Sequence, residues 1–101
     1  MQSAKILFVI PPSSSKVITN SQIFAYLLNT QNNGTNAGYG SFILQGYSPG
    51  TSVRNHIITL GKGSEVDVSI DENTFVINNR NSFANLHCSL LVLIGDAPIV
   101  T

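Results

Sequence analysis

The sequence predicts one all-β domain over residues 1–101, a small antiparallel β-sandwich with little or no helix. Hydrophobic side chains recur with a period of two, which is the pattern of strands that bury one face. Turns rich in Gly, Pro, Asn and Ser follow one another at intervals of about eight to twelve residues, as in all-β domains. Ile, Leu and Val make up 28 of the 101 residues, enough for one small core.

The first third of the chain reads as short strands. Lys5–Ile10 is expected to be a strand that ends at a double proline, because proline cannot donate to a ladder and holds the preceding backbone extended. Val17–Thr19 and Gln22–Leu28 follow, either as two strands or as one strand interrupted between them. Gln22–Leu28 is also the one segment in which a helical turn competes with a strand.

The central part of the chain predicts strands separated by polar turns. Residues 29–40 are expected to form a turn-rich loop, and the Asn33–Gly34 pair within it is a hairpin signal. In Glu65–Ile70, three aliphatic residues are predicted to face the core, while Glu65, Asp67 and Ser69 face water. Asn79–Asn81 is expected to be a polar turn. The strands expected here are Ser41–Gln45, Val53–Leu60, Glu65–Ile70 and Thr74–Asn78.

The last predicted strand is Asn85–Ile94. Alternate residues from Leu86 to Ile94 form one apolar face, and Leu91 and Leu93 make the second half of the other face apolar as well. A strand that is apolar on both faces needs cover on both. In a chain of this size we expect a second copy to cover Leu91 and Leu93, which are therefore candidate oligomer-interface residues.

Charged residues form only 10% of the chain, five basic against five acidic, whereas about 25% is usual in soluble domains. Ser, Thr, Asn and Gln supply 34 residues instead. Neutral polar side chains suit a subunit contact, since interface cores are depleted in charge, although the same composition could be a general property of small viral or extracellular β-domains. Without clustered Lys and Arg, no nucleic-acid partner is expected.

Neither membrane insertion nor export by a signal peptide is expected. The longest apolar run is Ile6–Ile10, far shorter than the ~20 residues of a membrane-spanning helix. The first residues lack the charged start and long apolar stretch of a Sec signal peptide. The only cysteine, Cys88, has no partner for an internal disulfide.

No pattern of catalytic or metal-ligating residues stands out. His87 and Cys88 are neighbours in a predicted strand and should point to opposite faces, which disfavours a catalytic dyad. His56, His87 and the acidic residues have no metal-ligand spacing, and Asp67–Asn73 lacks the glycine of a calcium loop. We therefore expect no cofactor, no metal and no enzymatic activity.

A candidate ligand-binding loop lies between residues 29 and 47. Planar amides and exposed aromatic rings match the hydroxyl groups and the apolar face of a sugar, and loops on a rigid sheet commonly carry binding residues. The alternative interpretation is an Asn/Gly-rich turn that only reverses the chain. The candidate residues are Asn32, Asn33, Asn36, Tyr39 and Tyr47.

Two segments carry a resemblance to a known family. Ile57–Val68 contains an apolar strand, a Gly-Lys-Gly-Ser turn and an alternating strand, and Ser82–Leu93 contains a Ser-Phe segment that leads into a terminal apolar strand. This pattern resembles the last strands of the jelly rolls of tumour necrosis factor and complement globular heads, and similar modules occur at the tips of phage fibres and on spore surfaces. The resemblance implies a jelly-roll-like sandwich and a homotrimer, with Leu91 and Leu93 near the three-fold contact.

These observations favour a non-enzymatic structural or attachment module. It would act as a homo-oligomeric fibre-tip or shell-decoration domain in a phage-like virion or a cell-surface assembly. The alternative is a carbohydrate-binding, lectin-like module that uses the loop of residues 29–47.

Overall fold

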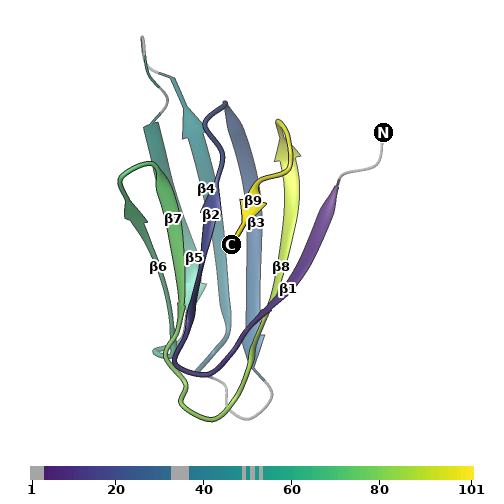
Figure 1. Ribbon diagram of the computed structural model, residues 1–101, viewed down its shortest axis with the longest axis vertical. Coiled ribbons are helices and arrows are strands. Elements are labelled where there is room, and N and C mark those ends of the chain that lie inside the picture. Colours follow the sequence, from purple (N-terminus) through teal and green to yellow (C-terminus); the bar gives the residue numbers. More distant parts are fainter. Residues whose placement is uncertain (1–3, 33–36, 49, 51, 53) are drawn as a thin grey trace.

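The computed structural model describes residues 4–32, 37–48, 50, 52 and 54–101. Nine strands in these residues form two antiparallel sheets, and none of these residues is helical (Figure 1). The predicted all-β sandwich is therefore confirmed. In the described part of the chain no helix has the length and apolarity that a membrane crossing would need.

The two sheets lie face to face, with the four-stranded sheet in front in Figure 1. The five-stranded sheet has the order β1 (Lys5–Ile10), β8 (Leu86–Ile94), β3 (Phe24–Asn32), β4 (Gly40–Tyr47), β5 (Arg54–Lys62). The four-stranded sheet has the order β6 (Val66–Asp71), β7 (Thr74–Asn79), β2 (Ser15–Thr19), β9 (Ile99–Val100).

The topology is jelly-roll-like only in part. β1 pairs with β8 in one sheet and β2 pairs with β7 in the other, so that these strand pairs nest as in a jelly roll. However, β3, β4 and β5 form a meander that stays within one sheet. The specific resemblance to tumour necrosis factor and complement globular heads is not confirmed.

The strands differ from the prediction in extent and in number. Gln22–Leu28 contains no helical turn, and the strand continues to Asn32 because β3 has a partner on each side, β4 and β8. β5 extends through Lys62, past the turn that was expected to begin at Gly61. A ninth strand was missed: Val17 and Thr101 exchange two backbone hydrogen bonds of 2.9 Å beside β9. Pairing with neighbouring strands outweighs local turn propensity here.

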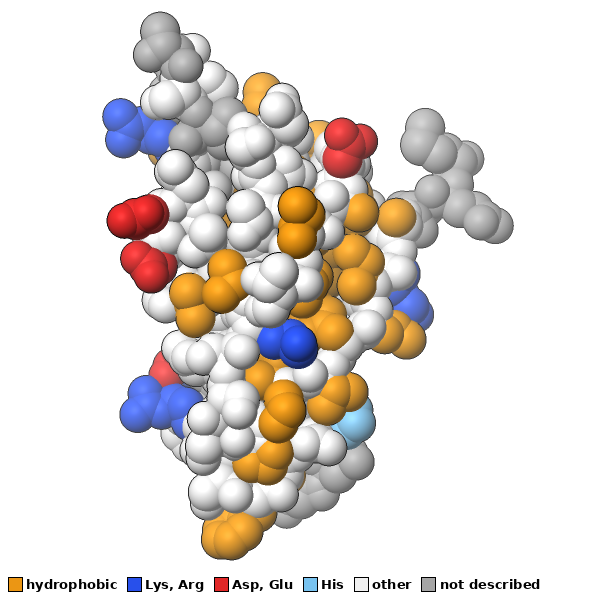
Figure 2. Space-filling model, in the orientation of Figure 1, with side chains coloured by type: hydrophobic (Ala, Val, Ile, Leu, Met, Phe, Trp, Pro, Cys, Tyr) orange, Lys and Arg blue, Asp and Glu red, His pale blue; other side chains and the backbone are white. Residues whose placement is uncertain are grey.

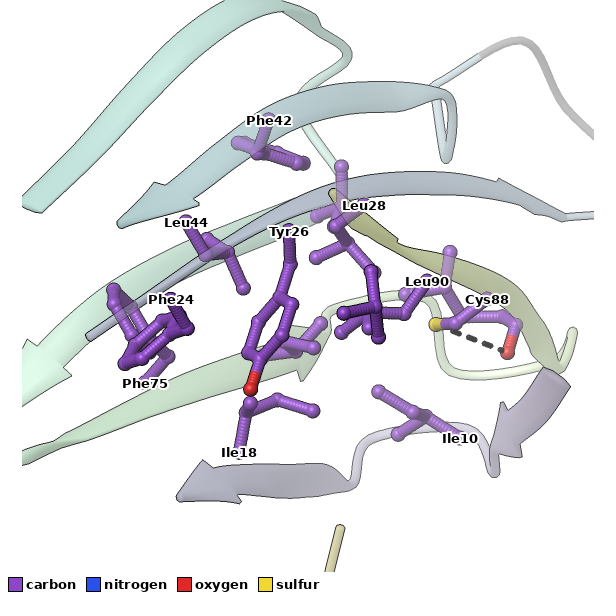
Figure 3. Packing of buried hydrophobic residues seen from close by; sticks show 14 residues of the cluster. Ile10, Ile18, Phe24, Tyr26, Leu28, Phe42, Leu44, Phe75, Cys88 and Leu90 are labelled. Atoms are coloured by element: carbon purple, nitrogen blue, oxygen red, sulfur yellow. Dashed lines mark hydrogen bonds between the residues drawn. The ribbon is translucent and has the colours of Figure 1, made fainter. Parts of the chain in front are cut away.

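The core lies between the sheets and is rich in aromatic and aliphatic side chains (Figure 3). Phe24 stacks on Tyr26 with ring centroids 4.5 Å apart and meets Phe75 edge-on at 5.8 Å. Both geometries are favourable for aromatic rings. Other fully buried side chains include Ile10, Ile18, Leu28, Phe42, Leu44, Val66, Ile77, Leu86 and Leu90.

The predicted alternation of buried and exposed residues in β8 and β6 is confirmed at most positions and fails at the upper end of each strand. Residues 86, 88, 90 and 92 of β8 are buried as predicted, but Ile94 is exposed. The pairing of β3 with β8 shifts register between Ala25 and Tyr26, and such an irregularity re-aims side chains. Val66 is buried, whereas Ile70 is exposed because β6 is an edge strand.

Candidate functional site

A groove of about 600 Å³ opens at the upper end of the sandwich in Figure 1. We call it the upper groove. The β2–β3 loop, the end of β4, the start of β5 and the β6–β7 turn converge on it, because alternate connections of an antiparallel sandwich lie at the same end. Its lining includes Asn20, Tyr47, Arg54, Asn55, Ile70, Glu72 and Asn73.

The polar side chains around the upper groove are largely unoccupied. Within the described residues, no side-chain hydrogen bond or ion pair is recorded for Arg54, Asn55, Glu72 or Asn73, and none of the four is buried. Arg54 and Glu72 lie on the same groove but do not pair with each other. The groove thus offers a guanidinium, a carboxylate and two amides to a ligand.

The upper groove has one rigid wall. The Asn20 side-chain NH₂ donates to the Tyr26 hydroxyl at 2.5 Å and to the Asp96 carbonyl at 3.2 Å, and its Oδ1 accepts from the Gln22 N–H at 2.8 Å. The Tyr26 hydroxyl donates to the same Asp96 carbonyl at 2.6 Å. Burial, the largest influence, raises the pKa of Tyr26, partly opposed by the hydrogen bond from Asn20.

The structure does not assemble the predicted ligand-binding loop as one site. Tyr39 precedes β4 and Tyr47 ends it, so eight residues of extended chain separate them by roughly 27 Å. Both rings are exposed, at 53% and 39%, but at opposite ends of the sandwich. Asn33 and Asn36 lie outside the described residues. Of the candidate residues that the structure describes, Tyr47 is the one that lines the upper groove.

Asn32 is a buried structural residue. It is only 3% exposed and donates to the Glu65 carboxylate at 3.1 Å, while Asn81 donates to the same oxygen at 2.6 Å. The expectation that Glu65 faces water is therefore wrong, because this half-buried carboxylate accepts hydrogen bonds from two strand ends. Amides from β3 and from the β7–β8 connection are thus joined across the lower end of the sandwich.

Two residues of the predicted polar turn at 79–81, Asn79 and Asn81, are also buried, whereas Arg80 between them is exposed. Asn79 is 2% exposed and its side-chain NH₂ donates to the carbonyls of Ile10, Pro11 and Ala84 at 2.9 to 3.1 Å. The Asn81 Oδ1 accepts from the backbone N–H groups of Phe83 and Ala84 at 2.7 Å. A short amide side chain can satisfy several backbone groups in a tight connection, and this explains why asparagine gathers here.

The predicted interface residues Leu91 and Leu93 lie on the outer face of the five-stranded sheet. Leu27 of β3 pairs with Leu91 and, on its other side, with Ile43 of β4. Ile43 pairs in turn with Ile58 of β5, which is 43% exposed. We call these four residues, Leu91, Leu27, Ile43 and Ile58, the outer stripe. Leu93 is 49% exposed, two residues beyond it on β8.

The outer face of the four-stranded sheet is more polar. Its cross-strand rows are Ser15–Asn78–Asp67, Val17–Val76–Ser69 and Thr19–Thr74–Asp71. Figure 2 views the molecule from this side and shows much white, polar surface, with hydrophobic side chains in small groups on the left and more densely on the right, where β8 and β1 lie.

Cys88 and His87 take opposite faces of β8, as the sequence predicted. Cys88 is buried, and desolvation raises the pKa of its thiol to about 12, so the reactive thiolate is suppressed at neutral pH. His87 is exposed. No group of three or more His, Cys, Asp or Glu residues in the described part of the chain is placed to hold a metal ion.

Sequence reasoning missed most of the upper groove. Its polar groups come from two segments that are far apart in the chain and share no motif: the start of β5, with Arg54 and Asn55, and the β6–β7 turn, with Glu72 and Asn73. One signal was available: in an antiparallel sandwich every second turn lies at the same end. This signal can be used only if every strand before a given turn has been predicted correctly.

No protein-family model and no curated protein sequence matches the chain. Among solved structures, the fold is similar to part of the tailspike protein gp49 of Acinetobacter baumannii bacteriophage Fri1, a capsular polysaccharide depolymerase. The TM-score is 0.61 at 15% identity, and the match covers 98% of this chain but 18% of the tailspike. The chain therefore has the fold of a small part of a phage tailspike.

Proposed function

We propose that this chain is a non-enzymatic β-sandwich module of a phage-like virion or cell-surface assembly, with a structural or attachment role. The observation that carries the proposal is the structural match, which takes in nearly all of this chain and a small part of a phage tailspike. A fold that forms one part of such a spike is suited to reuse as a module. The tailspike acts on a capsular polysaccharide, and an attachment role would bring this module to a similar cell surface.

The outer stripe supports self-association. It crosses four neighbouring strands, and the adjoining row contains the neutral residues Ser89, Asn29 and Ser41. The Ser41 hydroxyl already donates to Asn29 Oδ1 at 2.5 Å, so this row presents partly satisfied polar groups. An apolar stripe beside a neutral polar row costs little to desolvate against an identical surface, and Lys5 of β1 ends the stripe next to Leu91. We therefore propose a homo-oligomer, with a trimer favoured, in which this face is covered.

The test is the native mass in solution, measured by light scattering on a size-exclusion column. The proposal expects about three times the 10.8 kDa of one chain. The double variant Ile58→Asp with Leu93→Asp should reduce that mass to one chain, because charge on this face opposes burial. Both residues are partly exposed, so the fold should tolerate the change.

A matched control places the same charges on the other sheet. Ile70 and Ile99 are 43% and 66% exposed, and Ile70→Asp with Ile99→Asp should leave the native mass unchanged. A monomeric native protein would contradict the self-association. So would a mass that falls with the control variant and not with the outer-face variant.

A further inference from the structure

We propose that the upper groove is a binding site for a neutral oligosaccharide, with the Tyr47 ring as its platform and Arg54, Asn55, Glu72 and Asn73 as its hydrogen-bonding groups. All of these residues come from one chain. The site therefore needs no residue from a second copy, although Tyr47 shares the outward-facing positions of β4 with Ile43 of the outer stripe.

The shape of the groove suits a short sugar chain. Its volume of about 600 Å³ lies within the ~300–1,000 Å³ typical of small-molecule sites. Four separate segments of the chain form its walls, and they are anchored on strands of both sheets. A ligand that bridges these segments contacts both layers of the sandwich at once.

Tyr47 supplies the apolar surface. Its ring is 39% exposed and lies edge-on to the His56 ring, with centroids 6.5 Å apart and planes at 81°. Tyr47 directly follows Gly46, which lies against the buried ring of Phe24, so the backbone beneath it is fixed to the core. Tyr47 and Ile70 both line the groove, so a partly exposed aromatic ring and an aliphatic side chain offer the C–H face of a pyranose an apolar contact.

The polar groups match the hydroxyls of an uncharged sugar. Each hydroxyl both donates and accepts, as does each amide of Asn55 and Asn73. The Arg54 guanidinium only donates and the Glu72 carboxylate only accepts, and the two charges cancel. Figure 2 shows a basic group at the upper left and acidic groups below it on the left edge, with uncharged surface between them. A strongly acidic sugar would gain from the arginine but be repelled by the glutamate.

The wall of the groove is preorganised. Asn20 is held by hydrogen bonds from its own side chain to Tyr26 and Asp96, so the β2–β3 loop is ordered before a ligand arrives. Binding then needs little ordering of the chain, which favours affinity for a small ligand.

The experiment is an amide NMR titration of the isotope-labelled protein. The probes are neutral hexose and N-acetylhexosamine disaccharides, with a uronic-acid disaccharide alongside. We expect saturable shifts from the neutral probes at the amides of Tyr47, Arg54, Asn55 and Asn73. Tyr47→Ala should weaken binding about tenfold, as loss of an aromatic anchor does. Tyr47→Phe should retain most of it.

The chain contains a matched control for the aromatic ring. Tyr39 is also exposed but stands at the other end of β4, so Tyr39→Ala should leave the affinity unchanged. Glu72→Gln should weaken the neutral probes while keeping the native amide spectrum. The proposal is overturned by a lack of saturable shifts, by a preference for the uronic-acid probe, or by greater sensitivity to Tyr39→Ala than to Tyr47→Ala.

Discussion

The two ends of the sandwich contain the same kinds of side chain and use them differently. At the lower end, Asn32, Asn79 and Asn81 are buried and hydrogen-bonded to Glu65 or to backbone groups. At the upper end, Asn55 and Asn73 line a groove, and their side chains make no hydrogen bond to the described residues.

The hydrogen bonds that each side-chain amide makes within the protein therefore distinguish a structural amide from one that is available to a ligand. Composition alone does not separate them, since both ends are rich in asparagine. A buried amide whose donors are engaged stabilises the fold, and removing it leaves its partners unsatisfied. An amide in an open groove exchanges water for ligand at little cost to stability.

The largest expected effect comes from Asn79→Ala at the lower end. This change leaves the carbonyls of Ile10, Pro11 and Ala84 without their shared donor in a buried region. We expect the free energy of unfolding to fall by about 3 kcal/mol, near the upper range for unsatisfied buried groups. Urea denaturation followed by circular dichroism measures the change.

Asn73→Ala at the upper end is the paired control. We expect it to change the free energy of unfolding by less than about 0.5 kcal/mol, as for an ordinary surface substitution. Equal effects of the two substitutions would remove the distinction between the ends.

Gly46→Ala tests the aromatic packing beneath the upper end. A Cβ at position 46 would lie 2.2 Å from Cε1 of Phe24, whose ring is packed against Tyr26 and Phe75 and cannot withdraw easily. Overpacking of this kind costs about 2 kcal/mol. Gly50→Ala, where nothing lies within 4 Å, should be near neutral in the same thermal unfolding experiment. A neutral Gly46→Ala would mean that aromatic packing does not stabilise this end.

Much of the fold was predictable because it rests on local patterns. The alternation of Leu86, Cys88, Leu90 and Val92 placed β8 with the correct face inward, and the double proline marked the end of β1. Errors arose where pairing with a distant strand decides whether a segment becomes a strand. β9 is two residues long, and its pairing with β2 leaves no periodic signal in the sequence.

The candidate site was predictable only at Tyr47. Residue type pointed to an Asn/Tyr surface, but Tyr39 and Tyr47 lie at opposite ends of β4 and cannot meet. The remaining groove residues, including Arg54 and Glu72, are brought together by topology alone. Local composition carries no information about which turns share an end of a sandwich.

Tyr26→Phe tests how much the hydrogen bonds of the Tyr26 hydroxyl stabilise the upper end. Loss of the hydroxyl removes its hydrogen bonds with Asn20 and with the Asp96 carbonyl, and should lower the free energy of unfolding by about 1 kcal/mol. The raised pKa of Tyr26 also adds a pH dependence. The unfolded chain releases this proton first, so stability should fall as pH rises above 10 towards the folded pKa.

The phenylalanine variant should lose that part of the alkaline decline. Denaturation midpoints between pH 8 and pH 11 measure it in both proteins. An identical decline in the two would show that Tyr26 titrates alike in the folded and unfolded chain.

The smallest expected effect concerns the surface charges near the lower end. Asp67 lies 2.6 Å from Arg80 and 3.2 Å from Lys62, whereas Arg54 and Glu72 beside the upper groove do not pair. The hydrogen bond from Arg80, followed by that from Lys62, lowers the pKa of Asp67 against the opposing effect of desolvation. Because the side chains of Asp67 and Lys62 are about one third exposed and that of Arg80 is 63% exposed, salt screens their interaction.

The lowered pKa fixes the sign of the pH dependence. The contribution of Asp67 is fully present above the ordinary pKa of 3.8 and is lost as pH falls through the lower folded value. Asp67→Asn should therefore lower the denaturation midpoint slightly at pH 7 and low salt, and leave it unchanged at high salt. Glu72→Gln should produce no salt-dependent shift, since Glu72 has no ion-pair partner in the described part of the chain. Equal destabilisation by Asp67→Asn at low and high salt would contradict this prediction. It would mean that packing around Asp67, and not the pairing of its charge, stabilises the lower end.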